Sequence, residues 1–286
     1  MKVSKIGWTD FSGGSLNFAN GCTPISAGCN HCYARALDRR FSKEIPRVIV
    51  RPDNLETLRR TNFPKHSPKR GVGHKPMAFV CDMSDLFHKD VPDEIIERAF
   101  SIMGERWDVN WQVLTKRAGR MRNMVRRMCE ESYLAHISEN IWLGVSAENQ
   151  EMAVERIPTL LDTPAAVRFV SVEPMLGPVS LWRSVEGRYP AQYLHDTLCG
   201  ETPSPRIDWV ICGAESGPNR RPFDEAWAES LYEECKHFGI PFFGKQDSGF
   251  RPGVPLILPQ YGEVKEWPLP RQNALDMAHH LLMQAE

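Results

Sequence analysis

The sequence has no long apolar run and no strong overall charge. None of its apolar stretches approaches the roughly 18 to 20 residues that a membrane span requires, so we expect no membrane partner. The N-terminal stretch MKVSKIGWTDFSGG lacks the apolar core of a secretory signal, and we therefore expect a cytoplasmic protein. Internal repeats and low-complexity tracts are also missing. The composition, 42% hydrophobic and 25% charged, is typical of a globular protein.

The formal net charge is only −1, but the basic residues are unevenly distributed. Residues 35 to 75 contain twelve Lys and Arg against four Asp and Glu, and residues 116 to 127 contain six basic residues and no acid. Such patches attract phosphate groups even when the whole chain is nearly neutral. Solvated helix faces explain them equally well. A nucleotide or nucleic-acid partner is therefore one of two interpretations of these patches.

Apolar runs and helical patterns alternate along most of the chain. A Gly-rich G-x-G-x-x-G turn after the first run is missing, which argues against a dinucleotide-binding fold. Continuous apolar runs suit parallel strands that are buried on both faces. We therefore predict an α/β fold, a partial or closed β/α (TIM-like) barrel of about six to seven parallel strands. The predicted strands are residues 15 to 20, 77 to 85, 110 to 117, 141 to 149, 167 to 175, 208 to 217 and 240 to 247.

Three segments interrupt this alternation. We predict that residues 1 to 250 form the barrel, with a basic, largely irregular excursion at 35 to 75 and an insertion at 177 to 206. Residues 251 to 286 are predicted to wrap the surface and to end in a helix.

Polar side chains follow the predicted strands at their carboxyl ends. In a β/α barrel these ends meet at one mouth, where active sites are built. Helix capping explains Ser, Asp and Asn at such positions, but Lys, Arg, Glu and Gln are poor caps. We therefore expect a shared polar cavity. Its candidate residues are Asp82, Ser84, Asp85, Thr115, Lys116, Arg117, Ser146, Glu148, Ser171, Glu173, Glu215, Lys245 and Gln246.

Three of the eight cysteines form the only dense cluster, in the stretch NGCTPISAGCNHCYA. Cys22, Cys29 and Cys32 follow the first predicted strand with the spacing C-x6-C-x2-C. Thiols this dense in a reducing compartment indicate a metal. Structural zinc usually takes four protein ligands, and His31 is too close to Cys32 in sequence to join the same tetrahedron.

Three thiolates suit a four-iron four-sulfur cluster that leaves one iron open for a small molecule. Radical S-adenosylmethionine enzymes use this arrangement, with the loop directly after the first strand of a barrel. Their usual spacing is C-x3-C-x2-C, so the second gap of this sequence fits and the first gap is longer. We therefore favour a 4Fe-4S cluster with S-adenosyl-L-methionine, with zinc as the alternative.

Nine stretches occur in an order that is highly specific: IGWTD, GCTPISAGCNHCYA, RPDNLE, SDLFH, QVLTKR, WLGVSAEN, EPMLGP, DWVICGAESGPNRRP and PFFGKQ. Together they resemble a family of phage- and prophage-associated proteins of unknown function that is known by its three-cysteine motif. The resemblance runs from Ile6 to Gln246. It implies a remote branch of the radical-SAM barrels, with spore photoproduct lyase as a distant relative.

These observations lead to a radical-SAM-type iron–sulfur enzyme that repairs or modifies a nucleotide or nucleic-acid base. The alternative is a non-enzymatic nucleic-acid-binding protein with a structural zinc or iron–sulfur site. A third hypothesis is a hydrolase that uses Glu148, Glu173 and Glu215, but this hypothesis leaves the three thiols unexplained. In the first hypothesis Cys22, Cys29 and Cys32 bind the cluster. Asp82, Ser84, Ser146, Glu148 and Glu173 bind the cofactor, and Lys116, Arg117, Glu215, Lys245 and Gln246 face the substrate.

Overall fold

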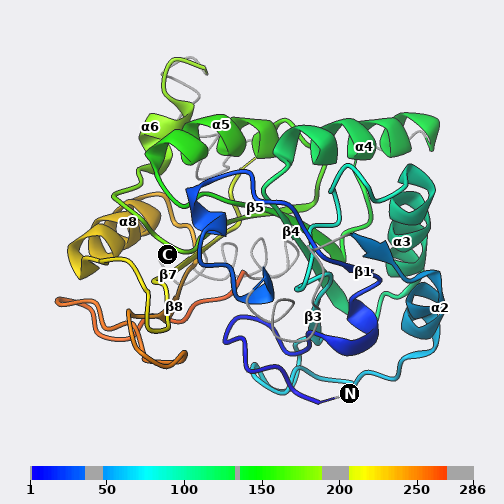
Figure 1. Cartoon of the computed structure of the whole chain (residues 1–286), viewed down its shortest axis with the longest axis horizontal. Helices are drawn as coiled ribbons and strands as arrows, with labels where there is room; N and C mark the ends of the chain where they lie inside the picture. Colours follow the sequence, from blue (N-terminus) through cyan, green and yellow to red (C-terminus); the bar gives the residue numbers. More distant parts are fainter. Residues whose placement is uncertain (1, 36–47, 133–135, 189–205, 269–286) are drawn as a thin grey trace, which may run out of the picture.

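A six-stranded parallel sheet forms the centre of the protein (Figure 1). The computed structural model describes residues 2–35, 48–132, 136–188 and 206–268. The strands follow one another in the sheet in chain order, so that β3 and β8 are its two edges. This arrangement is an open half-barrel, which confirms the predicted partial β/α barrel with six strands. The strands are β3 (Met77–Phe79), β4 (Asn110–Thr115), β5 (Ile141–Ser146), β6 (Val167–Val172), β7 (Trp209–Gly213) and β8 (Phe242–Gln246).

Helices cover the outer face of the sheet. They are α3 (Asp93–Glu105), α4 (Ala118–Glu131), α5 (Gln150–Leu161), α6 (Leu181–Val185) and α8 (Glu225–His237). Their apolar sides pack on the outward-facing strand residues, such as Leu143, Val170 and Val210, in one continuous core. Three of these helices begin at capping side chains: Asn149 accepts from the Met152 amide, Ser180 from the Arg183 amide and Asp224 from the Ala226 amide.

Aromatic side chains fill the inner face of the half-barrel near the amino ends of the strands. Trp209 lies at their centre, with ring centroids 6.0–6.3 Å from those of Trp8, Trp142, Phe169 and Phe243. Strand residues alternate between faces, so the inner row of β5 continues from Trp142 through Gly144 and Ser146. The inner face therefore changes from aromatic to polar toward the carboxyl ends, and the candidate site lies there.

Residues 15 to 20, predicted as the first strand of the barrel, do not pair with the six-stranded sheet, so this prediction is wrong. The segment contains a 3₁₀ turn, η1 (Gly14–Leu16), and a two-residue strand, β1 (Ala19–Asn20). That strand pairs antiparallel with β2 (Ile49–Val50), outside the six-stranded sheet. Only single parallel bridges, Phe11 to Ala78 and Gly21 to Ser84, connect the N-terminal segment to β3 and the loop beyond it. The left-handed glycines at 13 and 14 lie directly before the predicted strand and start the η1 turn there.

Two segments outside the barrel units lie at the sheet edges. Within residues 48 to 75 the chain forms α2 (Pro52–Arg60), followed by a loop that leads into β3. Residues 264–266 run antiparallel along β8, where the Gly244 amide donates to the Val264 carbonyl at 2.8 Å. Most of the predicted insertion and the predicted C-terminal helix lie outside the described residues. In the described part of the chain, no helix is long and apolar enough to cross a membrane.

Candidate functional site

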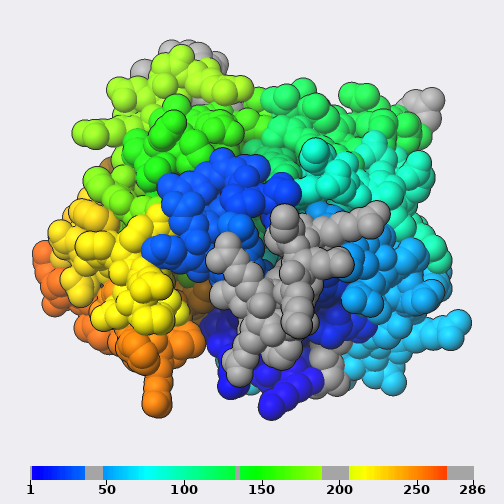
Figure 2. All heavy atoms as spheres, viewed as in Figure 1, coloured from blue at the N-terminus to red at the C-terminus, as the bar shows by residue number. Residues whose placement is uncertain are grey.

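The three-cysteine loop crosses the carboxyl ends of the strands. It runs from Gly21 to Cys32 and contains one 3₁₀ turn, η2 (Ala27–Cys29). All three thiols are half-buried and free. Figure 2 shows this part of the chain at the surface, as a blue patch between the green and yellow segments. The loop is placed where the polar end of the inner face begins.

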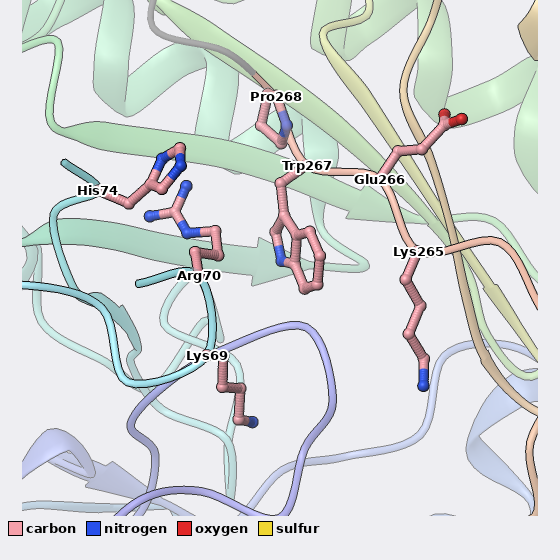
Figure 3. Close-up of a pocket in the computed structure, with 7 residues that line it drawn as sticks. All are labelled: Lys69, Arg70, His74, Lys265, Glu266, Trp267 and Pro268. Carbon is pink, nitrogen blue, oxygen red and sulfur yellow. The ribbon is translucent and has the colours of Figure 1, made fainter. Parts of the chain in front are cut away.

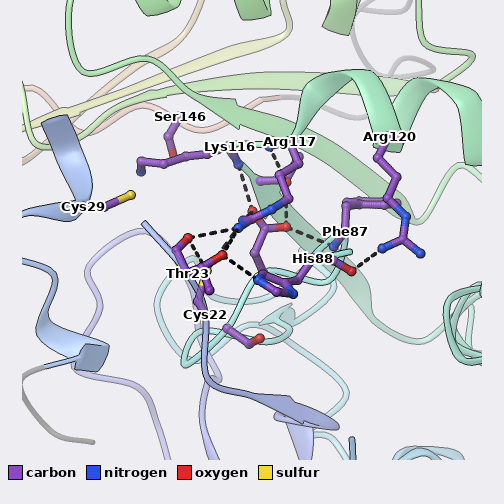
Figure 4. A network of polar contacts seen from close by, with 12 residues as sticks. Cys22, Thr23, Cys29, Phe87, His88, Lys116, Arg117, Arg120 and Ser146 are labelled. Atoms are coloured by element: carbon purple, nitrogen blue, oxygen red, sulfur yellow. Dashed lines mark hydrogen bonds and ion pairs between the residues drawn. The ribbon is translucent and has the colours of Figure 1, made fainter. Parts of the chain in front are cut away.

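An arginine holds the first cysteine (Figure 4). The Arg117 guanidinium donates to Asp85 Oδ2 at 2.8 Å, to the Thr23 carbonyl at 3.0 Å and to Cys22 Sγ at 3.5 Å. The buried ring of His88 joins this network through a 2.7 Å hydrogen bond between Nε2 and Thr23 Oγ1. Asp85 is fixed by the Thr115 hydroxyl at 2.7 Å. The start of the loop is therefore tied to the ends of β3 and β4.

A buried glutamate holds the middle of the loop. Glu148 Oε1 accepts from the Gly28 amide at 3.0 Å, and Oε2 accepts from Arg156 at 3.0 Å. Both side chains of this ion pair are at most 2% exposed. Burial favours the neutral carboxyl, but the Ser26 hydrogen bond and the charges of Lys116 and Arg156 outweigh it, so the pKa of Glu148 lies below its usual value. A Cβ at position 28 would lie 2.9 Å from the carboxyl carbon, so glycine admits this contact.

A second buried glutamate holds the end of the loop. Glu215 forms an ion pair with Arg221 and a 3.1 Å hydrogen bond with His31 Nδ1. Arg221 also donates to the Ala27 carbonyl at 3.0 Å. Burial opposes ionisation of Glu215, yet the hydrogen bonds from Arg221 and His31 lower its pKa below the usual value. His31, which lies between two of the cysteines, thus serves as a contact to the barrel.

A third strand-end carboxylate, that of Glu173, pairs with a lysine of β8. Glu173 Oε1 forms a 3.0 Å ion pair with Lys245, and the Ser171 hydroxyl donates to Oε2 at 3.3 Å. The carboxylate passes over Gly213, where an added Cβ would lie 2.8 Å from Oε1. The Glu173 and Lys245 side chains are 13% and 25% exposed. This pair therefore combines an accessible cation and an accessible carboxylate on the inner side of the half-barrel.

The other predicted site residues mostly contact backbone. The Ser84 hydroxyl donates to the Gly21 carbonyl at 2.6 Å. Gln246 is held at both ends, by the Ala214 carbonyl at 2.9 Å and the Gly253 amide at 3.2 Å. Asp82 accepts from Asn17 at 2.6 Å, and burial raises its pKa. Lys116 and Ser146 lie near the loop in Figure 4. All five therefore take part in local structure, Lys116 through its amide on Asp85 and Ser146 through its carbonyl, which accepts from Arg156 at 2.8 Å.

The donor chemistry of the loop suits a thiolate-bound cluster. Three thiols, a hydroxyl 3.9 Å from Cys29 Sγ (Ser26) and an arginine beside Cys22 share one loop. Burial raises the pKa of Cys22, and Arg117 opposes this. Among the described residues, no three His, Cys, Asp or Glu side chains are gathered as a metal site. The residue types therefore fit a cluster, and the three thiols have to turn toward one another when one binds.

Sequence reasoning missed the basic partners of the two loop-holding glutamates. Arg156 follows Glu148 by eight residues and Arg221 follows Glu215 by six, each inside the next segment of the same βα unit. An arginine at this distance from a strand-end glutamate is the only signal in the sequence. Arg156 lies outside the nine specific stretches, and Arg221 lies inside DWVICGAESGPNRRP without any sign of its partner, so both pairings emerge only from the folded chain.

The basic run of residues 116 to 127 is mostly engaged within the protein. Arg120 pairs with Asp93, and Arg127 pairs with Asp93 and Glu97 on α3. Arg117 is bound to Asp85. The second interpretation of this run, as ordinary helix-face charge, therefore accounts for most of its arginines.

The fold and the loop define a half-barrel protein with three thiols at the carboxyl ends of its strands. A model of the family described as "Protein of unknown function (DUF5131)" matches residues 3–267. The chain belongs to this family. The expected membership in an uncharacterised family is thus confirmed, and the expected association with phages stays a prediction.

Solved structures of spore photoproduct lyase are similar to the chain. A point mutant of that enzyme matches with 10% sequence identity and a TM-score of 0.46, over 82% of this chain and 75% of the other. Spore photoproduct lyase complexed with dinucleoside spore photoproduct matches over the same shares with 11% identity and the same TM-score. No curated protein sequence matches the chain.

Proposed function

We propose that the protein is an iron–sulfur enzyme of the radical S-adenosylmethionine type, with a nucleotide or nucleic-acid base as its substrate. One observation carries this proposal: three half-buried free thiols share a loop that is fixed over the polar end of a parallel half-barrel. Cysteines that form no disulfide are available as thiolate ligands of an iron–sulfur cluster. A cytoplasmic setting is part of the proposal.

In this proposal Cys22, Cys29 and Cys32 hold the cluster. Such a cluster, when bound with S-adenosylmethionine, supplies the electron that cleaves the sulfonium. Glu173, just beyond β6, and Lys245, in β8, bind the polar groups of the cofactor or substrate. Lys245 suits a carboxylate or phosphate, and Glu173 suits an ammonium or a ribose hydroxyl. Glu148 and Glu215 act as positioning residues, because their carboxylates are occupied by the loop.

The substrate class rests on the charge around the mouth. Lys116 is half-buried, and its charge helps to lower the pKa of Glu148, which holds the loop. The arginines of α4 contribute less, because most are paired with acidic side chains. A phosphate-bearing substrate is therefore proposed for the mouth itself, with Lys116 and Lys245 as its basic contacts.

Reductive cleavage of S-adenosylmethionine tests this function. The anaerobically reconstituted protein, given dithionite and S-adenosylmethionine, is expected to release 5′-deoxyadenosine. Lys245→Met should reduce this release while leaving the cluster spectrum intact, and Lys236→Met, an exposed side chain of α8, serves as the matched lysine control. A loaded cluster without any product, in the presence and absence of oligonucleotides, would contradict the enzyme proposal.

A second candidate function is a nucleic-acid-binding protein whose loop carries a structural metal. The observation in its favour is that the loop is fixed at its start, middle and end by protein contacts, as a structural site would be. It predicts strongly salt-dependent binding of oligonucleotides without turnover. The same cleavage assay separates the two candidates, because only the enzyme forms 5′-deoxyadenosine.

A further inference from the structure

A polar cavity lies at the end of the half-barrel opposite the cysteine loop (Figure 3). Its volume is about 330 Å³. One wall comes from the loop that leads into the amino end of β3, and the other from the segment that runs beside β8. The cavity thus spans the open side of the sheet. It is lined by Lys69, Arg70, His74, Lys265, Glu266, Trp267 and Pro268.

A buried aspartate in the IGWTD stretch builds the first wall. Asp10 is fully buried and accepts from the Ser67 hydroxyl at 2.8 and 2.9 Å, from the Lys69 amide at 3.1 Å and from the Met77 amide at 2.8 Å. The Ser67 hydroxyl in turn accepts from the Arg70 amide at 3.0 Å. The loop that carries the basic side chains is therefore held in place from inside the protein. Asp10 therefore supports the wall of this cavity, a role that is separate from the cysteine site.

Two buried N–H donors in this cavity have no acceptor in the described part of the chain. They are Arg70 Nε and Trp267 Nε1. The indole nitrogen of Trp267 faces the side of the cavity where Arg70 and His74 lie (Figure 3). A buried donor without an acceptor destabilises the folded protein, so both groups favour a ligand that brings acceptor oxygens.

The charges of the lining favour an anion. The lining has three basic residues, Lys69, Arg70 and Lys265, and one acidic residue, Glu266. Lys265 is paired with Glu263 outside the lining, so its charge is partly compensated. The ammonium of Lys69 is occupied by the Ile6 and Thr9 carbonyls, so it contributes charge and no free donor. Burial lowers the pKa of Arg70, and Asp10 only partly opposes this. An oxyanion beside Arg70 would compensate the guanidinium charge and satisfy its free donor.

We propose that this cavity binds the phosphate group of a small molecule, up to about the size of a nucleoside monophosphate. Arg70 Nε and Trp267 Nε1 donate to the phosphate oxygens, and the remaining volume holds the organic part. Ligand pockets of about 300–1,000 Å³ are usual for small molecules, and this cavity lies at the low end of that range. The site is separate from the thiol loop, so the proposal is independent of the reaction proposed above.

Calorimetric titration of the full-length purified protein tests the proposal, with inorganic phosphate and adenosine 5′-monophosphate as separate probes. Binding of either probe is expected, and tighter binding of the nucleotide would identify an organic phosphate as the preferred source. Trp267→Phe removes the indole N–H together with the five-membered ring, and keeps a six-membered aromatic ring beside Phe243. It should weaken binding roughly tenfold, the usual effect of a lost hydrogen bond to a charged group. Trp182→Phe, between α6 and α8, is the matched control and should change nothing.

The NMR signals of the indole N–H groups give a second measurement, which does not depend on the binding affinity of a variant. In a ¹H–¹⁵N spectrum, the Trp267 indole signal should shift when phosphate or the nucleotide is added, while the Trp182 signal stays fixed. The Trp267→Phe spectrum identifies the signal by its loss. The proposal is overturned if neither probe binds at millimolar concentration, or if binding leaves the Trp267 signal unmoved and is unchanged in Trp267→Phe.

Discussion

Glu148 and Glu173 occupy the same place on neighbouring strands and have different surroundings. Each follows a serine by two residues, and the two serines, Ser146 and Ser171, are paired across β5 and β6. Glu148 is fully buried between Arg156 and the Gly28 amide. Glu173 is partly exposed and pairs with Lys245 across Gly213.

The two carboxylates therefore have different roles at the same end of the barrel: Glu148 supports the loop, and Glu173 is available for the proposed chemistry. A fully buried carboxylate that accepts from a guanidinium and from a loop amide positions the loop and is out of reach of a ligand. A carboxylate whose partner is an accessible lysine can exchange that partner for a ligand at small cost. We therefore expect substitutions at Glu148 to change stability, and substitutions around Glu173 to change function.

The largest expected effect is the loss of stability in Glu148→Ala. This substitution leaves the buried Arg156 without its partner, and breaking such a pair costs about 3–5 kcal/mol. Urea unfolding followed by circular dichroism measures the free energy of unfolding. A loss below about 1 kcal/mol would contradict the assigned support role.

Gly28→Ala should have the next largest effect. The new Cβ would lie 2.9 Å from the Glu148 carboxyl carbon and 3.2 Å from its Cγ, and Arg156 prevents that side chain from moving away. Overpacking of this kind costs about 1–3 kcal/mol. Gly119→Ala in α4 is the matched control, because its Cβ meets nothing within 4 Å and alanine favours a helix. Equal stability of the two variants would argue against the close contact.

Gly213→Ala should affect function more than stability. Its Cβ would displace Glu173 Oε1, the end of a flexible side chain, and so break the ion pair with Lys245. The loss of a partly exposed pair costs about 1 kcal/mol or less. We expect unfolding close to wild type and a clear loss of 5′-deoxyadenosine formation. Wild-type cleavage rates in this variant would remove the Glu173–Lys245 pair from the proposed chemistry.

Acid titration should give the smallest effect and the sharpest contrast. The pKa of Glu148 lies below its ordinary value of 4.5 in the folded protein, so its charge stabilises the fold above that value. This contribution falls as the pH drops through the folded pKa, because both states then carry the proton. The difference in unfolding free energy between wild type and Glu148→Gln should therefore shrink below about pH 4.5. A difference that stays constant into acid would show that the charge contributes nothing.

The sheet could be predicted from the sequence because its strands are continuous apolar runs. Residues 141 to 146 and 167 to 172 show this plainly, since both faces of each strand are buried. The segment at 15 to 20 has a similar pattern, but Leu16 and Phe18 are buried by packing beside β3 instead of by pairing in the sheet. An apolar pattern predicts that a segment is buried, but it does not predict which strand the backbone of that segment pairs with.

The division of labour among the strand-end carboxylates could not be predicted. Ser-x-Glu occurs at the ends of both β5 and β6, and nothing in either stretch tells which glutamate meets Gly28 and which meets Lys245. The distinction depends on which strand end lies under the loop, a property of the folded chain. The mouth as a whole was predictable because parallel strands bring all their carboxyl ends together.

The metal and sulfide content of the protein tests the central claim most directly. Anaerobically reconstituted wild type is expected to hold about four iron and four sulfide per chain, as a four-iron cluster requires. Cys22→Ala, Cys29→Ala and Cys32→Ala should each lose them, whereas Cys129→Ala, a buried thiol of α4, should retain them. Stoichiometric zinc with no iron, or iron that survives all three loop substitutions, would contradict the account.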